Sequence, residues 1–328
     1  MRAMVINKVG GPEVLEEAEL PRPQPGAGQV LIKLARAGVN PVDWKDREGA
    51  MQAFFPYVFP YTGGIEGAGI IEEIGQNVDG FTVGDRVLAL SDHDSGKPGT
   101  FAEFSLSAAD RVAHMPASVG YSQAVTVPVS GTTAWNAVQY FSGIQAGHRV
   151  LIHGGSGQVG SFAIQFAKRL GAKVAATCST EKLDYVKGFG ADIVIDYKVD
   201  DIRKKITAWN NQGVDVIVDT VGHGTLPTAL DLLAAAGRLV NIPTLTGDGD
   251  VEADTKLAAK RGLEKVMAYG TMDDPSGLMT EILGLIASGV VKTPKIHELP
   301  LTQIAQAQTM VRQGKFAGKM VLKIADFE

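Results

Sequence analysis

The spacing of apolar residues divides the chain into two kinds of region. In the first third, short apolar or alternating runs lie close together between glycines and prolines. This pattern is typical of β-strands, and such short gaps leave little room for crossover helices, so we expect a largely antiparallel, barrel-like domain. The expected strands are 3–9, 30–35, 69–74, 86–90 and 101–105. Residues 40–49 predict a short helix, with Asn40 as its N-cap and Pro41 in its first turn.

From about residue 124, continuous apolar runs alternate with helical periodicity. Such runs are typical of parallel strands that are buried on both faces. The expected strands are 149–153, 173–178, 192–196, 214–219, 237–242 and 265–270. Between the first two, one helical face carries Val159, Phe162, Ala163, Phe166, Ala167 and Leu170, and Gly171 follows as a C-cap. Six strands with interleaved helices predict an α/β fold with a doubly wound, Rossmann-type parallel sheet.

The end of the chain returns to strand character. Residues 292–301 are expected to be extended, 302–313 helical, and 318–324 a strand that completes the first sheet. The sequence therefore predicts a discontinuous, mostly β domain made of residues 1–124 and 292–328. It encloses a dinucleotide-binding domain made of residues 125–291.

Charge and composition narrow the possible functions. The 328 residues carry a formal net charge of −5 and no Lys/Arg-rich run, which argues against nucleic acid as a partner. No stretch of the sequence approaches the 18 uninterrupted apolar residues of a membrane-spanning helix, and the N-terminus lacks the apolar region of a secretory signal. We therefore expect a cytoplasmic protein with no membrane partner. A single cysteine, Cys178, excludes an internal disulfide and an all-cysteine metal cluster within one chain.

The segment HGGSGQVG, residues 153–160, joins an expected strand to an expected helix. In this context glycines let the backbone approach a pyrophosphate, and the N–H groups at the helix N-terminus favour its negative charge. We therefore expect a dinucleotide to be bound by Gly154, Gly155, Ser156, Gly157, Gln158, Val159 and Gly160.

The end of the second strand predicts which dinucleotide is bound. An NAD site favours Asp or Glu at this point, whereas this chain continues from Cys178 to Ser179 and Thr180. Ser179, Thr180 and Lys182 could hold a 2′-phosphate, which favours NADP(H). Two alternatives stay open, because Lys182 could be a solvated surface charge and Glu181 offers a weaker case for NAD. Val221, Gly222, Ile242 and Pro243 follow later strands, at the sheet edge where ligands bind.

Six segments resemble the zinc-free quinone oxidoreductase branch of the medium-chain dehydrogenase/reductase superfamily; they are residues 35–49, 63–87, 99–107, 127–135, 153–168 and 318–322. The resemblance implies a GroES-like catalytic domain, and an enzyme that transfers hydride from NADPH to a quinone or an α,β-unsaturated carbonyl. It also implies a homodimer, for which the expected strand 265–270 is the candidate edge. The cysteine and histidine ligands of the zinc-dependent relatives would align with Asn40 and Ile65, so we expect no metal.

The resemblance also suggests roles for single residues. Asn40 would contact the nicotinamide ribose or the substrate oxygen, with a simple helix cap as the alternative, and Asp43 would orient the Asn40 loop. The remaining cofactor contacts that it suggests are Thr132 near the nicotinamide, Ser179, Lys182 and Tyr197 at the adenosine phosphate, and Lys319 at the phosphates. Strand-end packing for Tyr197 and a surface lysine at 319 are the alternatives. The proton donor would be Lys45, Tyr57 or solvent.

Some signals are interpreted as structural. Asp92, His93 and Asp94 are expected in a solvated loop without a metal. His153 is expected to pack at a strand end, and Cys178 to be inert. Two other functions remain open: an enzyme of the enoyl reductase type, and an NADPH-binding redox sensor or structural protein without turnover. Residues 51–61 and 244–256 are expected to shape the substrate pocket.

Overall fold

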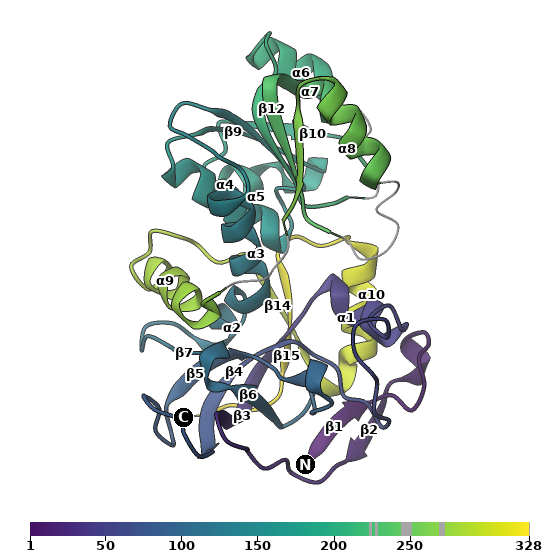
Figure 1. The fold of residues 1–328 in the computed structure, drawn as a ribbon, viewed down its shortest axis with the longest axis vertical. Coiled ribbons are helices and arrows are strands. Elements are labelled where there is room, and N and C mark those ends of the chain that lie inside the picture. Colours follow the sequence, from purple (N-terminus) through teal and green to yellow (C-terminus); the bar gives the residue numbers. More distant parts are fainter. Residues whose placement is uncertain (223–224, 227–228, 244–250, 269–272, 328) are drawn as a thin grey trace. The chain divides into compact units, whose positions relative to one another are not determined.

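The computed structural model describes residues 1–222, 225–226, 229–243, 251–268 and 273–327, with only the backbone for 251–254. The chain forms two compact units (Figure 1). Unit 1 comprises Met1–Val129, Met272–Val290 and Lys295–Glu328, and unit 2 comprises Ser130–Thr271 and Val291–Pro294. The α/β fold class predicted from the sequence, a Rossmann sheet plus a mostly β, GroES-like domain, is confirmed.

Unit 1 is built on a seven-stranded sheet. Six of its strands follow one another in the order β14-β15-β3-β4-β5-β7, and β6 pairs with β3; β1 and β2 form a separate pair. Its strands are β1 (Arg2–Val5), β2 (Glu16–Glu19), β3 (Gln29–Val39), β4 (Glu66–Ile74), β5 (Arg86–Leu90), β6 (Phe104–Ala108), β7 (Val112–His114), β14 (Ile296–Pro300) and β15 (Lys319–Lys323). Its helices are η1 (Pro12–Val14), α1 (Pro41–Arg47), η2 (His93–Ser95), η3 (Ala109–Arg111), α2 (Tyr121–Ala124), α9 (Pro275–Ala287), η7 (Leu301–Gln303) and α10 (Ile304–Gln313).

The long strand β3 organises this sheet, because it pairs antiparallel with β4, β6 and β15. The predicted C-terminal strand does complete the first sheet, since Met320 pairs with Val39 and Lys323 with Arg36. The strand expected at residues 101–105 begins later in the structure, where it is β6 (Phe104–Ala108). Phe101 instead donates its N–H to Gly63 and accepts a hydrogen bond from Met4, so it ties loops together ahead of the strand.

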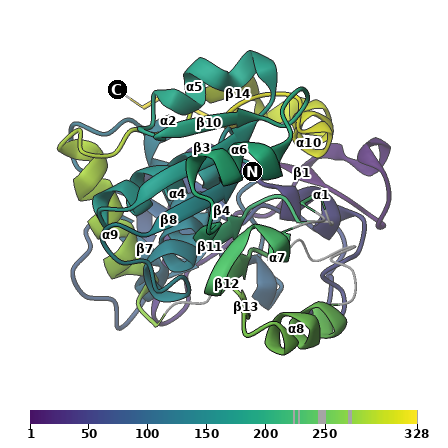
Figure 2. The same cartoon turned by 90° about the horizontal axis from the view of Figure 1, so that it is seen from above.

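Unit 2 contains six parallel strands in the order β10-β9-β8-β11-β12-β13 (Figure 2). These strands are β8 (Arg149–His153), β9 (Lys173–Cys178), β10 (Ile193–Asp196), β11 (Val214–Asp219), β12 (Leu233–Asn241) and β13 (Glu264–Met267). The helices are α3 (Thr132–Trp135), η5 (Asn136–Tyr140), α4 (Gln158–Arg169), η6 (Thr180–Lys182), α5 (Leu183–Lys187), α6 (Ile202–Trp209), α7 (Ala229–Leu232) and α8 (Val251–Lys260), and η4 (Val127–Gly131) leads into the unit. This strand order is that of a dinucleotide-binding sheet.

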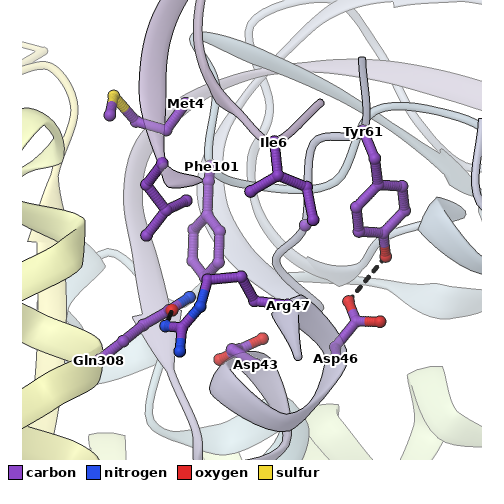
Figure 3. A pocket seen from close by; sticks show the side chains of 10 residues that line it. Met4, Ile6, Asp43, Asp46, Arg47, Tyr61, Phe101 and Gln308 are labelled. Atoms are coloured by element: carbon purple, nitrogen blue, oxygen red, sulfur yellow. Dashed lines mark hydrogen bonds between the residues drawn. The ribbon is translucent and has the colours of Figure 1, made fainter. Parts of the chain in front are cut away.

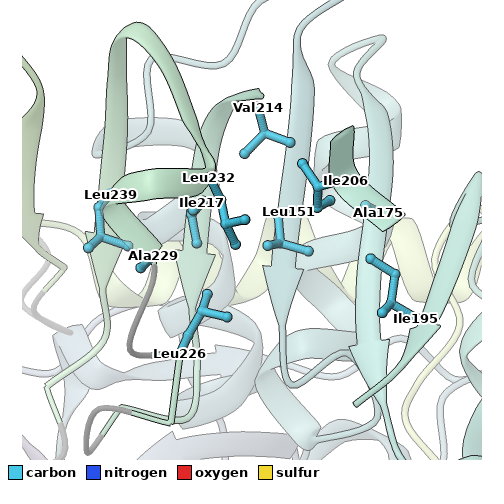
Figure 4. Close-up of a cluster of buried hydrophobic side chains, with 10 residues drawn as sticks. All are labelled: Leu151, Ala175, Ile195, Ile206, Val214, Ile217, Leu226, Ala229, Leu232 and Leu239. Carbon is cyan, nitrogen blue, oxygen red and sulfur yellow. The ribbon is translucent and has the colours of Figure 1, made fainter. Parts of the chain in front are cut away.

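The continuous apolar runs form the core of unit 2. Leu151, Ala175 and Ile217, from three neighbouring strands, are fully buried together with Ile206 of α6 (Figure 4). All six predicted strands are present. β12 begins earlier than expected, and residues 269–270 of the sixth lie outside the described part of the chain.

The compact units differ from the domain boundaries expected from the sequence at helix α9. The sequence pattern placed residues 275–287 with the dinucleotide-binding sheet, because they follow its sixth strand. In the structure they belong to unit 1, where α9 packs against β7 and Ser276 Oγ donates to Val112 O at 2.6 Å. The amphipathic pattern of a helix shows that one face is buried, but not which sheet covers it.

Candidate functional site

The turn between β8 and α4 is shaped by close backbone packing. Gly154 has a φ of +84°, which only glycine adopts readily, and a Cβ there would lie 2.6 Å from Val221 Cγ2. A Cβ on Gly160 would lie 2.2 Å from Gly154 O, so the first turn of α4 packs directly on the loop. At Gly157, by contrast, a Cβ would meet only Gly154 O, at 3.4 Å. The N-cap of α4 is Gly157, which has no side chain to accept from the first N–H groups of the helix, and N–H groups of this kind can bind a phosphate.

Two side chains that the sequence analysis did not assign to the site hold this turn in place. His153 is buried, with Nδ1 at 2.8 Å from Thr177 Oγ1 and Nε2 at 3.0 Å from Thr225 Oγ1. Thr177 Oγ1 also accepts the Gly154 N–H at 3.0 Å. Burial lowers the pKa of His153, so the imidazole is a neutral connector, as its predicted packing role requires.

The second such side chain is Asp219, at the end of β11. Its Oδ1 accepts the N–H groups of Val221 and Gly222, each at 3.0 Å, and its backbone O accepts the Ile242 N–H at 3.0 Å. Two of the predicted cofactor residues are therefore held by one buried carboxylate, and a third is held by the backbone carbonyl of the same residue. Asp219 is the last residue of the apolar run VDVIVD, and this position could have predicted its role. A carboxylate at the end of a buried strand needs hydrogen-bond donors nearby.

The end of β9 carries a small polar cluster. Ser179 is buried and its Oγ donates to Glu181 Oε1 at 2.7 Å, while Lys198 Nζ lies 3.2 Å from Glu181 Oε2. Thr180 is exposed, and the side chain of Tyr197 is 51% exposed, so strand-end packing does not account for it. Lys198 was missed because it follows the third strand, and only the parallel pairing of β9 and β10 brings it near Ser179.

Cys178, at the end of the same strand, has the properties of a structural thiol. It is buried, and burial raises its pKa to about 11, which suppresses the reactive thiolate at neutral pH. Thr132 is also buried, in the first turn of α3, and Pro243 is half-buried after β12.

In unit 1, Asn40 and Lys319 belong to a fully buried polar cluster. Asn40 Nδ2 donates to Glu66 Oε1 at 2.7 Å, and Lys319 Nζ donates to Asn40 Oδ1 at 2.6 Å and also to Glu66 Oε1. Glu66 Oε2 accepts the Val129 N–H at 2.8 Å. Glu66 and Lys319 both have no exposed surface, so the interpretation of Lys319 as a surface lysine is wrong. The buried partner is Glu66, which the sequence analysis did not assign to the site.

Asp43 lies beside this cluster in α1. Its Oδ2 accepts the Asn40 N–H at 2.5 Å, the contact that orienting the Asn40 loop requires, whereas Oδ1 is buried without a hydrogen-bond partner in the described part of the chain. Burial raises the pKa of Asp43 well above its ordinary value, despite the opposing effects of the Asn40 N–H and of Lys319. Lys45, on the same helix, is buried, with Nζ 5.3 Å from the centre of the Trp44 ring.

Tyr57 and Tyr61 share one buried carboxylate, that of Asp46. Tyr61 OH donates to Asp46 Oδ2 at 2.7 Å (Figure 3). Tyr57 OH donates to Asp46 Oδ1 and to its backbone O. The two rings stack with centroids 4.5 Å apart. Burial, and then the Asp46 carboxylate, raise the pKa of Tyr57. The phenol is therefore held in its protonated form and is a weak acid.

Figure 3 shows a cavity beside this pair, lined by Asp43, Asp46, Arg47 and Gln308 among others. Its volume of about 10 Å³ suits a single water molecule and is too small for a quinone. It belongs to the interior of unit 1 and is no substrate pocket.

The prediction that Asp92 and His93 lie in a solvated loop is wrong, because both residues are buried. Asp92 Oδ2 accepts Gln29 Nε2 at 2.7 Å and Oδ1 accepts the Ala108 N–H at 3.1 Å, while His93 Nδ1 lies 3.1 Å from Ser91 Oγ. These contacts join the loop to the sheet.

Within the described ranges, no three His, Cys, Asp or Glu side chains come together as a metal-binding group. The same ranges contain no helix with the length and apolar character needed to cross a bilayer.

Comparison with known proteins gives matches along nearly the whole chain. Residues 26–117 match the alcohol dehydrogenase GroES-like domain, and residues 159–284 match the family described as zinc-binding dehydrogenase. The pig quinone oxidoreductase is 32% identical, over 98% of this chain and 97% of its own. Two solved structures each cover 99% of this chain and are matched over their whole length. They are an NAD-dependent alcohol dehydrogenase (29% identical, TM-score 0.88) and a mycobacterial protein complexed with NADPH (28% identical, TM-score 0.86).

Proposed function

Because the chain belongs to the quinone oxidoreductase family of the medium-chain dehydrogenase/reductase superfamily, we propose that it reduces a quinone or an α,β-unsaturated carbonyl compound with NADPH and without zinc. Bound NADPH would supply the hydride. The protein would supply the binding sites, the orientation of the reactants and the donors for the developing oxyanion.

The observation that carries the proposal is the turn between β8 and α4. Its glycines bring backbone within contact distance of backbone, and Gly157 leaves space on its Cβ side. The N–H groups that begin α4 and the helix dipole suit the charge of a pyrophosphate. Asp219 would keep Val221, Gly222 and Ile242 at the same edge of the sheet, where dinucleotides bind.

Zinc independence is supported by the chemistry of the Asn40 cluster. Residues 40 and 65 are Asn and Ile, which lack the thiolate and imidazole that zinc prefers. The remaining carboxylate, Glu66, is paired with the Lys319 ammonium. A second cation placed there would be repelled by that ammonium, and Glu66 is already neutralised.

The source of the proton is proposed to be solvent. Of the two side-chain candidates, Tyr57 donates its hydrogen to Asp46 and has a raised pKa, both of which oppose proton release. Lys45 is buried beside Trp44. The hydroquinone monoanion or the enolate left by hydride transfer takes up its proton readily from water, so the reaction does not require a dedicated acid.

The first test is turnover, measured by the loss of reduced-nicotinamide absorbance with a panel of simple quinones and 2-enals. NADPH and NADH are compared in parallel. We expect turnover with at least one acceptor, no stoichiometric zinc in the purified protein, and no effect of a chelator on the rate. Tightly bound zinc at about one per chain, with chelator-sensitive oxidation of alcohols, would contradict the proposal. Cofactor binding without turnover on any acceptor would favour a sensor.

We further propose that the protein is a cytoplasmic homodimer paired through the free edge of the unit 2 sheet. β13 is the last strand of that sheet, so its outer edge is available for pairing within the described residues. Light scattering that gives the mass of one chain would rule out the dimer.

A further inference from the structure

The carboxylate of Glu181 contacts two donors, the Ser179 hydroxyl after β9 and the Lys198 ammonium after β10. Ser179 Oγ donates to one oxygen at 2.7 Å, and Lys198 Nζ lies 3.2 Å from the other. Ser179 is buried, so its hydroxyl direction is fixed by its surroundings. The Ser179 hydrogen bond, then a hydrogen bond from the Glu181 backbone N–H and then Lys198 lower the pKa of Glu181 to about 2, so the carboxylate is charged at neutral pH.

A 2′-phosphate would need the same kind of donors. A hydroxyl and an ammonium hold a phosphate dianion by charge-assisted hydrogen bonds, as they hold a carboxylate. The two anions cannot occupy the same donors, and like charges close together repel. Asp196 ends the neighbouring strand β10 opposite Cys178, and its buried Oδ2 has no hydrogen-bond partner among the described residues.

We propose that Glu181 is a built-in competitor of the 2′-phosphate and that Lys198 is the cation for which the two compete. The inference rests on the proposed dinucleotide site. When a 2′-phosphate binds, Glu181 gives up Ser179 and Lys198. When the ribose has a free 2′-hydroxyl, the carboxylate stays in place and accepts its hydrogen bond. Glu181 therefore narrows the preference for NADPH over NADH, and this chain uses both cofactors.

The experiment isolates this pocket by using ligands that differ only in the 2′-phosphate. Binding of 2′,5′-ADP and of 5′-AMP to the full chain is measured by isothermal titration calorimetry. In the variant Glu181→Gln, the ratio of the two dissociation constants is expected to move about tenfold toward 2′,5′-ADP, because one charge-assisted contact is freed. In Lys198→Met, the ratio is expected to move the opposite way while 5′-AMP binding changes little.

Asp231→Asn is the matched control. It removes the same charge from another surface carboxylate of unit 2, one that is paired with Arg203 and Arg261. An unchanged ratio in this variant shows that the effect is local to the β9 end. If Asp231→Asn shifts the ratio as much as Glu181→Gln does, long-range charge explains the result and the inference is overturned.

Failure of the inference can be told apart from failure of the proposed function. If the wild-type chain binds both ligands but Glu181→Gln leaves their ratio unchanged, Glu181 is no competitor and only the inference fails. If the wild-type chain binds neither ligand, nor NADPH or NADH, the dinucleotide site itself is refuted and both proposals fall.

Discussion

The glycine turn of unit 2 and the Asn40 cluster of unit 1 present polar groups in opposite ways. In the turn, the groups are the backbone N–H groups that begin α4, small residues bring them into place, and the N-cap is Gly157, which has no side chain. In the cluster, full charges on Glu66 and Lys319 are completely buried and satisfied by each other and by Asn40. The turn depends on the absence of side-chain atoms, and the cluster depends on every one of its partners.

This difference determines how each region should respond to substitution. A buried charge that loses its partner keeps its desolvation penalty, so one substitution in the cluster should be severe and a second one should relieve it. A steric contact at Gly160 cannot be relieved by a partner elsewhere, because the atom that a Cβ would meet, Gly154 O, belongs to the backbone. The three predictions that follow test this contrast, beginning with the largest effect.

Lys319→Met should be the most damaging change. It leaves Glu66 buried with a negative charge, which Asn40 and Val129 still contact as donors, and the loss of one partner of a buried ion pair costs about 3–5 kcal/mol. The free energy of unfolding is measured in urea. The double variant Lys319→Met with Glu66→Gln should recover part of that loss, because the uncompensated charge is gone. A loss below about 1 kcal/mol in the single variant would show that the pair is not buried as described.

Gly160→Ala should cost about 1–3 kcal/mol of unfolding free energy and should also weaken NADPH binding, because its Cβ would lie 2.2 Å from Gly154 O. Gly157→Ala is the matched control three residues earlier. Its Cβ would meet nothing closer than 3.4 Å, so its stability should change by less than about 0.5 kcal/mol. Urea unfolding and calorimetric titration with NADPH measure the two effects. Equal stability losses in both variants would contradict the close packing of α4 on the turn.

The parts of the molecule that local pattern determines were predictable from the sequence. The apolar run of β8, the glycines after it and the amphipathic face of α4 follow one another in the chain, and their spacing already predicts a βαβ unit. The helix at Pro41 was predictable for the same reason, because Asn40 and Pro41 mark its start.

The buried charges were not predictable, because they depend on residues far apart in the chain. In β15, strand alternation puts Lys319 on the same face as Lys323, and Lys323 is exposed. Only the position of Glu66, 253 residues away, explains why Lys319 is buried. The same holds for Lys198 beside Glu181 and for Asp46 between two tyrosines. A single sequence shows that a residue can carry charge, but not which residue neutralises it.

The smallest of the three predicted effects concerns Asp43, next to the Asn40 cluster. It is a change in the free energy of unfolding with pH. Because burial raises its pKa in the folded protein, the unfolded chain loses this proton first as the pH rises above about 3.9. From there to the raised pKa the folded state binds more protons, so Asp43 lowers stability by about 1.4 kcal/mol per pH unit.

Asp43→Asn removes this titration and keeps an oxygen that can accept the Asn40 N–H, to which Asp43 Oδ2 is bonded in the wild type. We therefore expect the wild type to lose stability relative to the variant as the pH rises from about 4, and urea unfolding at a series of pH values measures that difference. Other titrating groups act in both proteins and largely cancel. A difference that stays constant with pH would mean that Asp43 is charged in the folded protein. In that case Lys319 would have to neutralise Asp43 as well as Glu66, and the cluster would be one network of three charges in place of an ion pair beside a neutral acid.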